Sequence, residues 1–170
     1  MPGPRATPEY AREAIAAAAA AMAHLTAASM RCLDEAQRQS RQLDDNHVGT
    51  EHIVLGVLAA DRDIAGMLAR DGITETVFRS QLFEEPGPSP DGHIPLTLRA
   101  QMILGLARSA ATADDDSGAI TPRHLMLGVI AESSDWRKRG FDGPHHLDQV
   151  AAAAGTSLAA IQSILSRSVT

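Results

Sequence analysis

The sequence predicts an all-α protein made of two similar halves and one additional N-terminal helix. Of its 170 residues, 44% are hydrophobic but only 3% are aromatic, which favours helices packed through aliphatic side chains. In addition, residues 48–58 read VGTEHIVLGVL, and residues 120–130 return as ITPRHLMLGVI. A repeat of this length indicates two copies of one helical unit.

Residues 1–24 are expected to form an N-terminal extension that contains one Ala-rich helix. Thr7 is a suitable N-cap, because Pro8 follows at the first helical position and Glu9 lies in the first turn. Acidic residues and His24 border the alanine run, which argues against a signal peptide. We therefore expect a helix from residue 8 to about residue 24, and the sequence shows no transmembrane segment.

Each half is predicted to hold four helices. The first repeat spans residues 25–83 and the second spans residues 96–166, with a Pro/Gly-rich linker at residues 84–95 between them. Each repeat opens with an amphipathic helix and continues with the repeated phrase, which is apolar enough to form a buried helix. Gly72 and Gly155 then stand where a helix C-cap is expected, before a last short helix.

The second repeat is longer than the first. Gly72 and Gly155 lie 83 residues apart whereas the repeated phrases lie 72 apart, so the second repeat holds about 11 extra residues, which we place at about 131–146. This insertion contains Trp136, Arg137 and Phe141, and such side chains are typical of interface anchors. It is a candidate partner contact, although a loop packed over its own core explains the residues equally well.

Composition limits the classes of function. The formal net charge is −6, so no global positive field attracts nucleic acid or an anionic membrane. Cys32 is the only cysteine, which excludes an intrachain disulfide, fits the cytoplasm and favours a small buried thiol. The phosphate-binding pattern Gly-x-x-x-x-Gly-Lys-Ser/Thr does not occur. We therefore expect a cytoplasmic protein that is not an enzyme and needs no cofactor.

The repeated phrase, the Leu-Thr pair before each opening helix and the glycine-closed helix together resemble the Clp repeat domain. This is the N-terminal double repeat of ClpC- and ClpA-type AAA+ unfoldases, and the resemblance covers about residues 25–165. The second copy is degenerate, with Thr-Pro-Arg-His in place of Gly-Thr-Glu-His. The resemblance implies a docking domain for adaptors and substrates, here without the ATPase module.

The resemblance also implies site residues. In ClpC-type members, two equivalent pockets recognise phosphorylated arginine through a threonine and the glutamate of Gly-Thr-Glu-His. Carried over, the first pocket would use Thr26 and Glu51, and a degenerate second one would use Thr97 and Arg123. The cation of Arg123 cannot pair with a guanidinium group, so the second pocket is expected to be lost or altered. Simpler roles also exist, since both threonines suit N-caps and Glu51 suits a first helical turn.

Residues 147–165 offer a different interpretation, because their Ala, Gly and Ser stand at the spacing of a DNA-binding helix-turn-helix. However, the second helix of this motif would carry no Lys or Arg before Arg167, and phosphate contacts dominate DNA affinity. The segment also aligns with residues from Met67 onward in the first repeat. Helix-turn-helix DNA binding is kept as the alternative function.

The histidines suggest metal binding or hydrolysis, but neither is well supported. His52 and His124 occupy equivalent places in the two buried helices, so we expect them to be structural. His145 and His146 follow Pro144 in an expected loop, without further ligands at regular spacing. No Ser/His/Asp arrangement is apparent, and we predict no metal site.

The sequence therefore predicts a monomeric or weakly associating module that binds protein partners. It would dock adaptors, peptides or degradation-marked substrates, including arginine-phosphorylated ones, in Clp-dependent proteolysis, or compete with the N-domain of an unfoldase. We expect no nucleic-acid or membrane partner.

Overall fold

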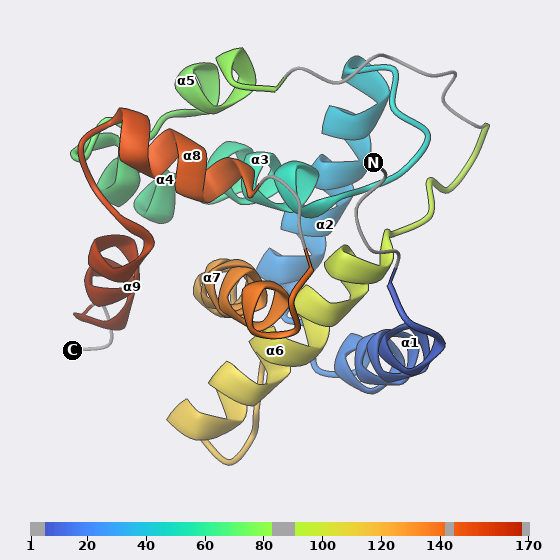
Figure 1. The fold of residues 1–170 in the computed structure, drawn as a ribbon. Helices are drawn as coiled ribbons and strands as arrows, with labels where there is room; N and C mark the ends of the chain where they lie inside the picture. Colours follow the sequence, from blue (N-terminus) through green and yellow to red (C-terminus); the bar gives the residue numbers. More distant parts are fainter. Residues whose placement is uncertain (1–5, 83–90, 142–144, 168–170) are drawn as a thin grey trace.

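The computed structural model describes residues 6–82, 91–141 and 145–167, and the predicted all-α fold is confirmed there. The described ranges hold no strand beyond two isolated bridges. The described helices are α1 (Pro8–Met22); α2 (Ala27–Gln42), α3 (Thr50–Ala60), α4 (Arg62–Ala69) and α5 (Glu75–Ser80) in the first repeat; and α6 (Leu98–Asp114), α7 (Pro122–Lys138), α8 (His146–Ala153) and α9 (Leu158–Arg167) in the second. Figure 1 shows their arrangement. None of these helices is long and apolar enough to cross a membrane.

The extra helix α1 begins as predicted and ends two residues earlier than expected. The Thr7 side chain accepts a hydrogen bond from the Tyr10 backbone N–H (3.2 Å), with Pro8 in the first turn. The helix lies against α6, where Gly105 permits a close crossing: a Cβ there would come within 2.5 Å of the Ala17 Cβ. Helix α1 is therefore an integral part of the packed structure.

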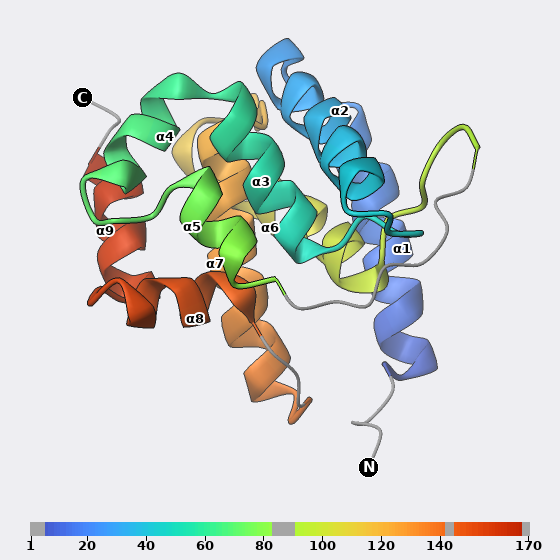
Figure 2. The same ribbon diagram turned by 90° about the horizontal axis from the view of Figure 1, so that it is seen from above.

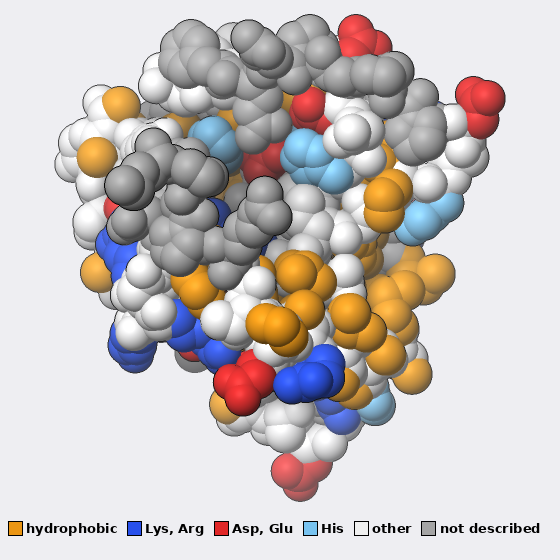
Figure 3. All heavy atoms as spheres, turned by 45° about the vertical axis from the view of Figure 1, so that its right-hand side comes forward, with side chains coloured by type: hydrophobic (Ala, Val, Ile, Leu, Met, Phe, Trp, Pro, Cys, Tyr) orange, Lys and Arg blue, Asp and Glu red, His pale blue; other side chains and the backbone are white. Residues whose placement is uncertain are grey.

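The outer face of α1 keeps apolar side chains in solvent. Met22 on α1 and Met30 on α2 are each 55% exposed, and they line a groove of about 210 Å³. Figure 3 looks onto this side of the molecule, where hydrophobic side chains gather. The chain thus has an apolar surface next to α1 and α2.

The repeated phrase forms the centre of the molecule, as predicted. Every residue from Thr50 to Leu58 on α3 is buried, and α3 and α7 lie between the remaining helices in both ribbon views (Figures 1 and 2). Gly56 meets α2 so closely that a Cβ would lie 2.3 Å from the Cys32 carbonyl oxygen. Gly128 meets α6 in the same way, 2.6 Å from the Ile103 carbonyl oxygen. The shared glycine therefore allows each opening helix to cross its buried helix at short distance.

Cys32 lies inside this crossing. Its thiol is buried, and burial raises its pKa to about 12, so it stays protonated at neutral pH. The structure supports the interpretation of Cys32 as a small apolar residue of the core.

Two short parallel bridges join the repeats. The Thr26 N–H donates to the Ile120 carbonyl (3.0 Å), and the Thr97 N–H donates to the Val48 carbonyl (3.0 Å). The start of each opening helix is thereby tied to the start of the buried helix of the other repeat. Because each bridge joins one repeat to the other, residues of different repeats lie next to each other at these points.

The predicted glycine caps are present. Gly72 and Gly155 have φ values of 79° and 77°, a left-handed conformation that glycine adopts without strain. Beyond them, the Ile73 N–H donates to the Leu68 carbonyl (3.0 Å), and the second repeat forms the equivalent bond. Both glycines therefore end their helices as expected.

The first half of the insertion of the second repeat, residues 131–138, is helical. Helix α7 has 17 residues against 11 in α3, so Trp136 and Arg137 continue the buried helix. The rings of Trp136 and Phe141 lie 5.5 and 5.7 Å from the ring of Tyr10 on α1. These two aromatic residues are half-buried and hold α1, which favours the packing interpretation over a partner contact. Arg137 is 61% exposed and pairs with Asp148.

Part of the sequence prediction lies outside the described residues. This applies to most of the linker expected at 84–95, of which only residues 91–95 are described. It applies also to Gly143 and Pro144 of the insertion.

A candidate binding pocket between the repeats

Glu51 is the second residue of α3 and is only 6% exposed. Its carboxylate folds back over Gly49, where a Cβ would lie 2.6 Å from either carboxylate oxygen. Glycine at position 49 therefore makes room for the acid at position 51. In the second repeat both positions differ, with Thr121 in place of the glycine and Arg123 in place of the acid.

His52 fixes the start of α3. The Gly49 N–H donates to His52 Nδ1 (2.9 Å), so the proton of the neutral ring is on Nε2, which donates to Asp45 (2.8 Å). The second repeat has the same arrangement. The Thr121 N–H donates to His124 Nδ1 (3.0 Å), and His124 Nε2 donates to Asp114 (2.7 Å). The structure thus gives both histidines the structural role that the sequence indicates.

The surroundings of Glu51 favour its ionised form. Burial raises the pKa of this carboxyl, but the contact with His47 and further polar neighbours lower it more, to about 2. Glu51 Oε1 lies 3.6 Å from His47 Nε2 and has no hydrogen-bond partner within the described residues. A charged, buried carboxylate oxygen is therefore available to a donor.

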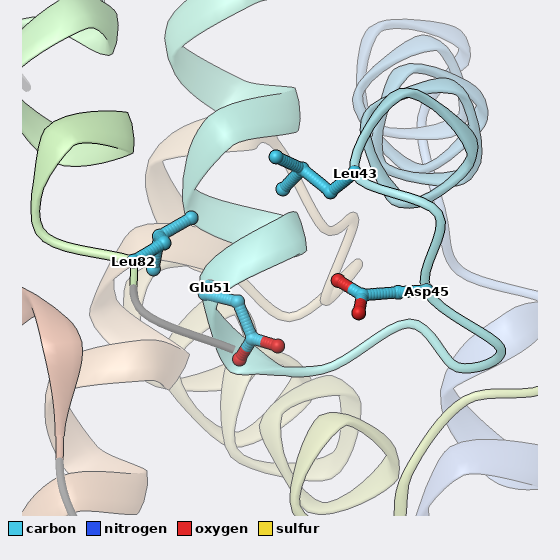
Figure 4. Close-up of a pocket in the computed structure, with 4 residues that line it drawn as sticks. All are labelled: Leu43, Asp45, Glu51 and Leu82. Atoms are coloured by element: carbon cyan, nitrogen blue, oxygen red, sulfur yellow. The ribbon is translucent and has the colours of Figure 1, made fainter. Parts of the chain in front are cut away.

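Glu51 also lines a small hollow of about 40 Å³ on its other side. Figure 4 shows the carboxylates of Glu51 and Asp45 facing this hollow from different segments, with Leu43 and Leu82 above them. The hollow is too small for a side chain of a ligand, so it belongs to the packing around α3.

A larger pocket of about 180 Å³ lies where the two repeats meet, and we call it the cross-repeat pocket. The N-terminal ends of α3, α6 and α8 converge on it, and helix N-termini carry positive partial charge. Among the described residues that line it, Glu51 is the only acidic one. These residues are His47, Gly49, Thr50, Glu51, Thr97, Arg99 and His146.

Arg99 gives this pocket a cationic side chain that sequence reasoning missed. Its Nε and Nη2 donate to the two carboxylate oxygens of Glu132 (2.7 and 3.0 Å). Its guanidinium carbon lies 4.4 Å from the ring centroid of Trp136. The only sequence signal is the position of Arg99 two residues after Thr97, because its partners come from distant α7.

The structure does not bring Thr26 and Glu51 together in one pocket. Residues 43–49 connect the end of α2 to the start of α3, so Glu51 lies beside the C-terminal end of α2. Thr26 caps the other end of this 16-residue helix, about 24 Å away. The residue that lines the pocket with Glu51 is Thr97, which the Val48 bridge brings there from the second repeat.

The structure does not bring Thr97 and Arg123 together either. Arg123 begins α7 beside the bridge of Thr26 and Ile120, at the opposite end of α6 from Thr97. The Arg123 guanidinium donates to Asp114 and approaches the Leu165 carbonyl (3.5 Å). It is therefore held by its own repeat.

Both threonines are N-caps, as the simpler interpretation has it. The Thr26 side chain accepts from the Ser29 N–H (3.2 Å), and the Thr97 side chain accepts from the Ala100 N–H (3.1 Å). Only Thr97 also lines the cross-repeat pocket.

The histidines near Glu51 do not make a convincing metal centre. His47, Glu51 and His52 place ligand atoms within 4.8 Å of one another. However, Nδ1 of His52 already accepts the Gly49 N–H, so this group supplies two ligands rather than the three or four of zinc sites. His146, expected in a loop, is the first residue of α8 and lines the pocket. We assign no metal to it.

The alternative of helix-turn-helix DNA binding gains no support. Ile161 and Leu165 of α9 are buried in the repeat, and Arg167 is the only cation on this helix. Helices α8 and α9 are the second-repeat counterparts of α4 and α5. They complete a repeat and offer no basic surface for phosphates.

The fold is similar to that of a class of domains, the N-terminal domains of Clp-type chaperones. The N-terminal domain of ClpD from Arabidopsis thaliana superimposes with a TM-score of 0.63 at 19% identity, covering 86% of this chain and 98% of that one. The N-terminal domain of Hsp104 from Candida albicans gives 0.64 at 15% identity, covering 83% and 88%. No protein-family model matches the chain.

Sequence similarity points to one branch of this class. The chain is homologous to the N-terminal region of ClpC, the ATP-binding subunit of the ATP-dependent Clp protease. It is 29% identical over 120 residues to ClpC of Staphylococcus aureus strain USA300, which is 69% of this chain. The matched part is only 14% of that relative's length. The predicted resemblance to the Clp repeat domain is thereby confirmed.

Proposed function

We propose that this chain is a protein-interaction module of Clp-dependent proteolysis and that its cross-repeat pocket binds phosphorylated arginine side chains. The observation that carries this proposal is the Glu51 carboxylate, which is buried, ionised and aimed at a pocket between two repeats. The module would bind marked substrates, peptides or adaptors, or compete for them with an unfoldase N-domain.

The chemistry of the pocket supports a ligand with both charges. A guanidinium group presents planar N–H donors that match a carboxylate, and Glu51 offers one with a buried oxygen. Next to it, the N-termini of α3 and α6 and the cation of Arg99 favour an anion. A phosphorylated guanidinium group carries both features a few ångströms apart.

The homology to ClpC supports a role in Clp-dependent proteolysis, but it does not identify the ligand or the partner. The relative is named as a subunit of the Clp protease, and this chain matches only a small part of it. We therefore assign to the chain the step of recognition, and no catalytic step.

Titration calorimetry with phosphoarginine tests the proposal. We expect the wild-type protein to bind and Glu51→Gln to bind at least tenfold more weakly, since a charge-assisted hydrogen bond contributes about 1.5–3 kcal/mol. Glu9→Gln is the matched control, because Glu9 is also a first-turn acid but is exposed on α1. The proposal fails if the wild-type protein does not bind, or if the Glu51 variant binds equally well.

A further inference from the structure

We propose that this chain forms a two-fold symmetric dimer, in which α1 packs antiparallel against α1 of a second copy, beside the apolar groove next to α2. This face shares no lining residue with the cross-repeat pocket, so the inference does not depend on the proposed function.

The outer face of α1 carries an apolar stripe. Ile15, Ala19 and Met22 follow one another at spacings of four and three residues, and all three are exposed. Ile15 and Met22 are each 55% exposed. This spacing keeps side chains on one side of a helix and is typical of a helix that pairs with another helix. The small side chain of Ala19 between the two larger ones lets a second helix come close.

The stripe continues into the groove of about 210 Å³ between α1 and α2. Met22 lines this groove with Met30 and Leu33 of α2, and Met30 is 55% exposed. Hydrophobic side chains gather on this side of the molecule (Figure 3). A connected apolar surface of this kind is typical of an interaction site.

The charges beside this surface favour a second copy as its occupant. Arg12 lies three residues before Ile15, and Asp34 lines the groove from α2. Both are exposed, and neither forms an ion pair within the part of the chain that the structure describes. A two-fold axis places a surface against itself, so each copy must carry both members of every charge pair. Arg12 and Asp34 meet this condition, and the dimer would form their pair twice.

The positions along α1 agree with this pairing. Arg12 and Met22 are ten residues apart, which is about 15 Å along the helix. In an antiparallel pair centred between them, Arg12 of one copy lies opposite Met22 of the other, and Met22 shares the groove with Asp34. In the same register Ile15 lies opposite Ala19, so a large side chain meets a small one. One register therefore satisfies the apolar and the charged contacts together.

Sedimentation velocity over a range of protein concentrations tests the dimer. We expect the wild-type protein to pass from monomer to dimer in the micromolar range, as small interfaces do. Ile15→Glu is expected to weaken the dimer at least tenfold, because it places a charge in the apolar stripe. Val77→Glu is the matched control with no expected effect, since Val77 is an apolar residue on α5 that is 37% exposed.

Charge exchange tests the register. Arg12→Glu and Asp34→Arg are each expected to weaken the dimer several-fold, because each change places like charges together at both ends. The double variant R12E/D34R is expected to return the dissociation constant to within about threefold of wild type, because it forms both pairs again with reversed polarity.

Cross-linking tests the contact between the two α1 helices. Cys32 is the only cysteine and is buried, so Ala19→Cys adds an accessible thiol to a chain that otherwise lacks one. A short bismaleimide is expected to link two copies of this variant. Ala153→Cys is the matched control, because Ala153 is an exposed alanine of α8, and it is expected to stay unlinked.

The outcomes separate this inference from the proposed function. If the wild-type protein stays monomeric at every concentration, the dimer is overturned, whether or not phosphoarginine binds. If a dimer forms that Ile15→Glu leaves unchanged, or if Ala19→Cys links no faster than Ala153→Cys, the copies associate through another face and the inference is again overturned. If R12E/D34R does not recover from the loss in its single variants, the antiparallel register is wrong.

Discussion

The Glu51 carboxylate illustrates how one buried charge is stabilised by small neighbours. Gly49 leaves it room, His47 faces it, and the N-terminal end of α3 adds positive partial charge. The second repeat lacks this combination, because a threonine and an arginine replace the glycine and the acid. Retaining an ionised acid in the core is consistent with a ligand that needs it.

The low pKa of Glu51 has a consequence for stability. Its pKa falls from the usual 4.5 to about 2 on folding, so the ionised carboxylate contributes stability above pH 4.5, on the order of 3 kcal/mol. This contribution is lost as the pH falls from 4.5 through 2, because the folded carboxyl finally binds its proton. We expect urea unfolding at pH 7, 5, 4 and 3 to show wild type approaching Glu51→Gln in stability. A difference that stays constant over this range would contradict the pKa.

At the scale of the elements, the repeated phrase allows two helices to cross at short distance. Its apolar residues bury α3 and α7, while Gly56 and Gly128 allow α2 and α6 to approach them at backbone distance. Leu, Val and Ile then fill the remaining space on all sides of each buried helix. This explains why the glycine is retained in both copies although glycine disfavours helix interiors.

Two glycines of the first repeat give opposite predictions. Gly56→Ala is expected to destabilise the protein by at least about 1–3 kcal/mol, because its Cβ would overlap the backbone of α2. Gly66→Ala is the matched control: it also lies within a helix, α4, but its Cβ would meet nothing within 4 Å. There we expect stabilisation of about 0.5–1 kcal/mol from higher helix propensity. Urea midpoints measure both, and an equal effect of the two changes would refute the crossing argument.

At the scale of the whole molecule, the repeats are related in fold but not in charge. The cross-repeat pocket combines Glu51 of the first repeat with Thr97 and Arg99 of the second. At the other junction, Thr26 meets Ile120. The residue that corresponds to Glu51 there is Arg123, and it pairs with Asp114. Within the described residues, the combination of a buried acid with a neighbouring arginine therefore occurs at the first junction and not at the second.

Calorimetry checks this asymmetry through stoichiometry. We expect one phosphoarginine per chain, and we expect Arg123→Ala to bind it with unchanged affinity, because Arg123 does not line the cross-repeat pocket. A second binding event in the wild-type protein, or a loss of binding in the Arg123 variant, would show that the other junction also takes the ligand.

Much of the fold could be predicted because it depends on local features. Thr7, Thr26 and Thr97 cap helices as expected, and Gly72 and Gly155 end them, since these roles need only the residue and its neighbours. The boundary of the insertion was harder. Residues that continue a helix and residues that form a loop look alike when no breaker separates them, so α7 extends further than predicted.

The sequence by itself determined the two repeats, their buried helices and the contrast between Glu51 and Arg123, because periodicity and side-chain charge are properties of the chain. Only the tertiary structure decided that Glu51 shares its pocket with Thr97 rather than Thr26. The reason is that the backbone bridges join opposite repeats, and such long-range pairing leaves no local pattern. Arg99 was missed for the same physical reason, since Glu132 reaches it from 33 residues away.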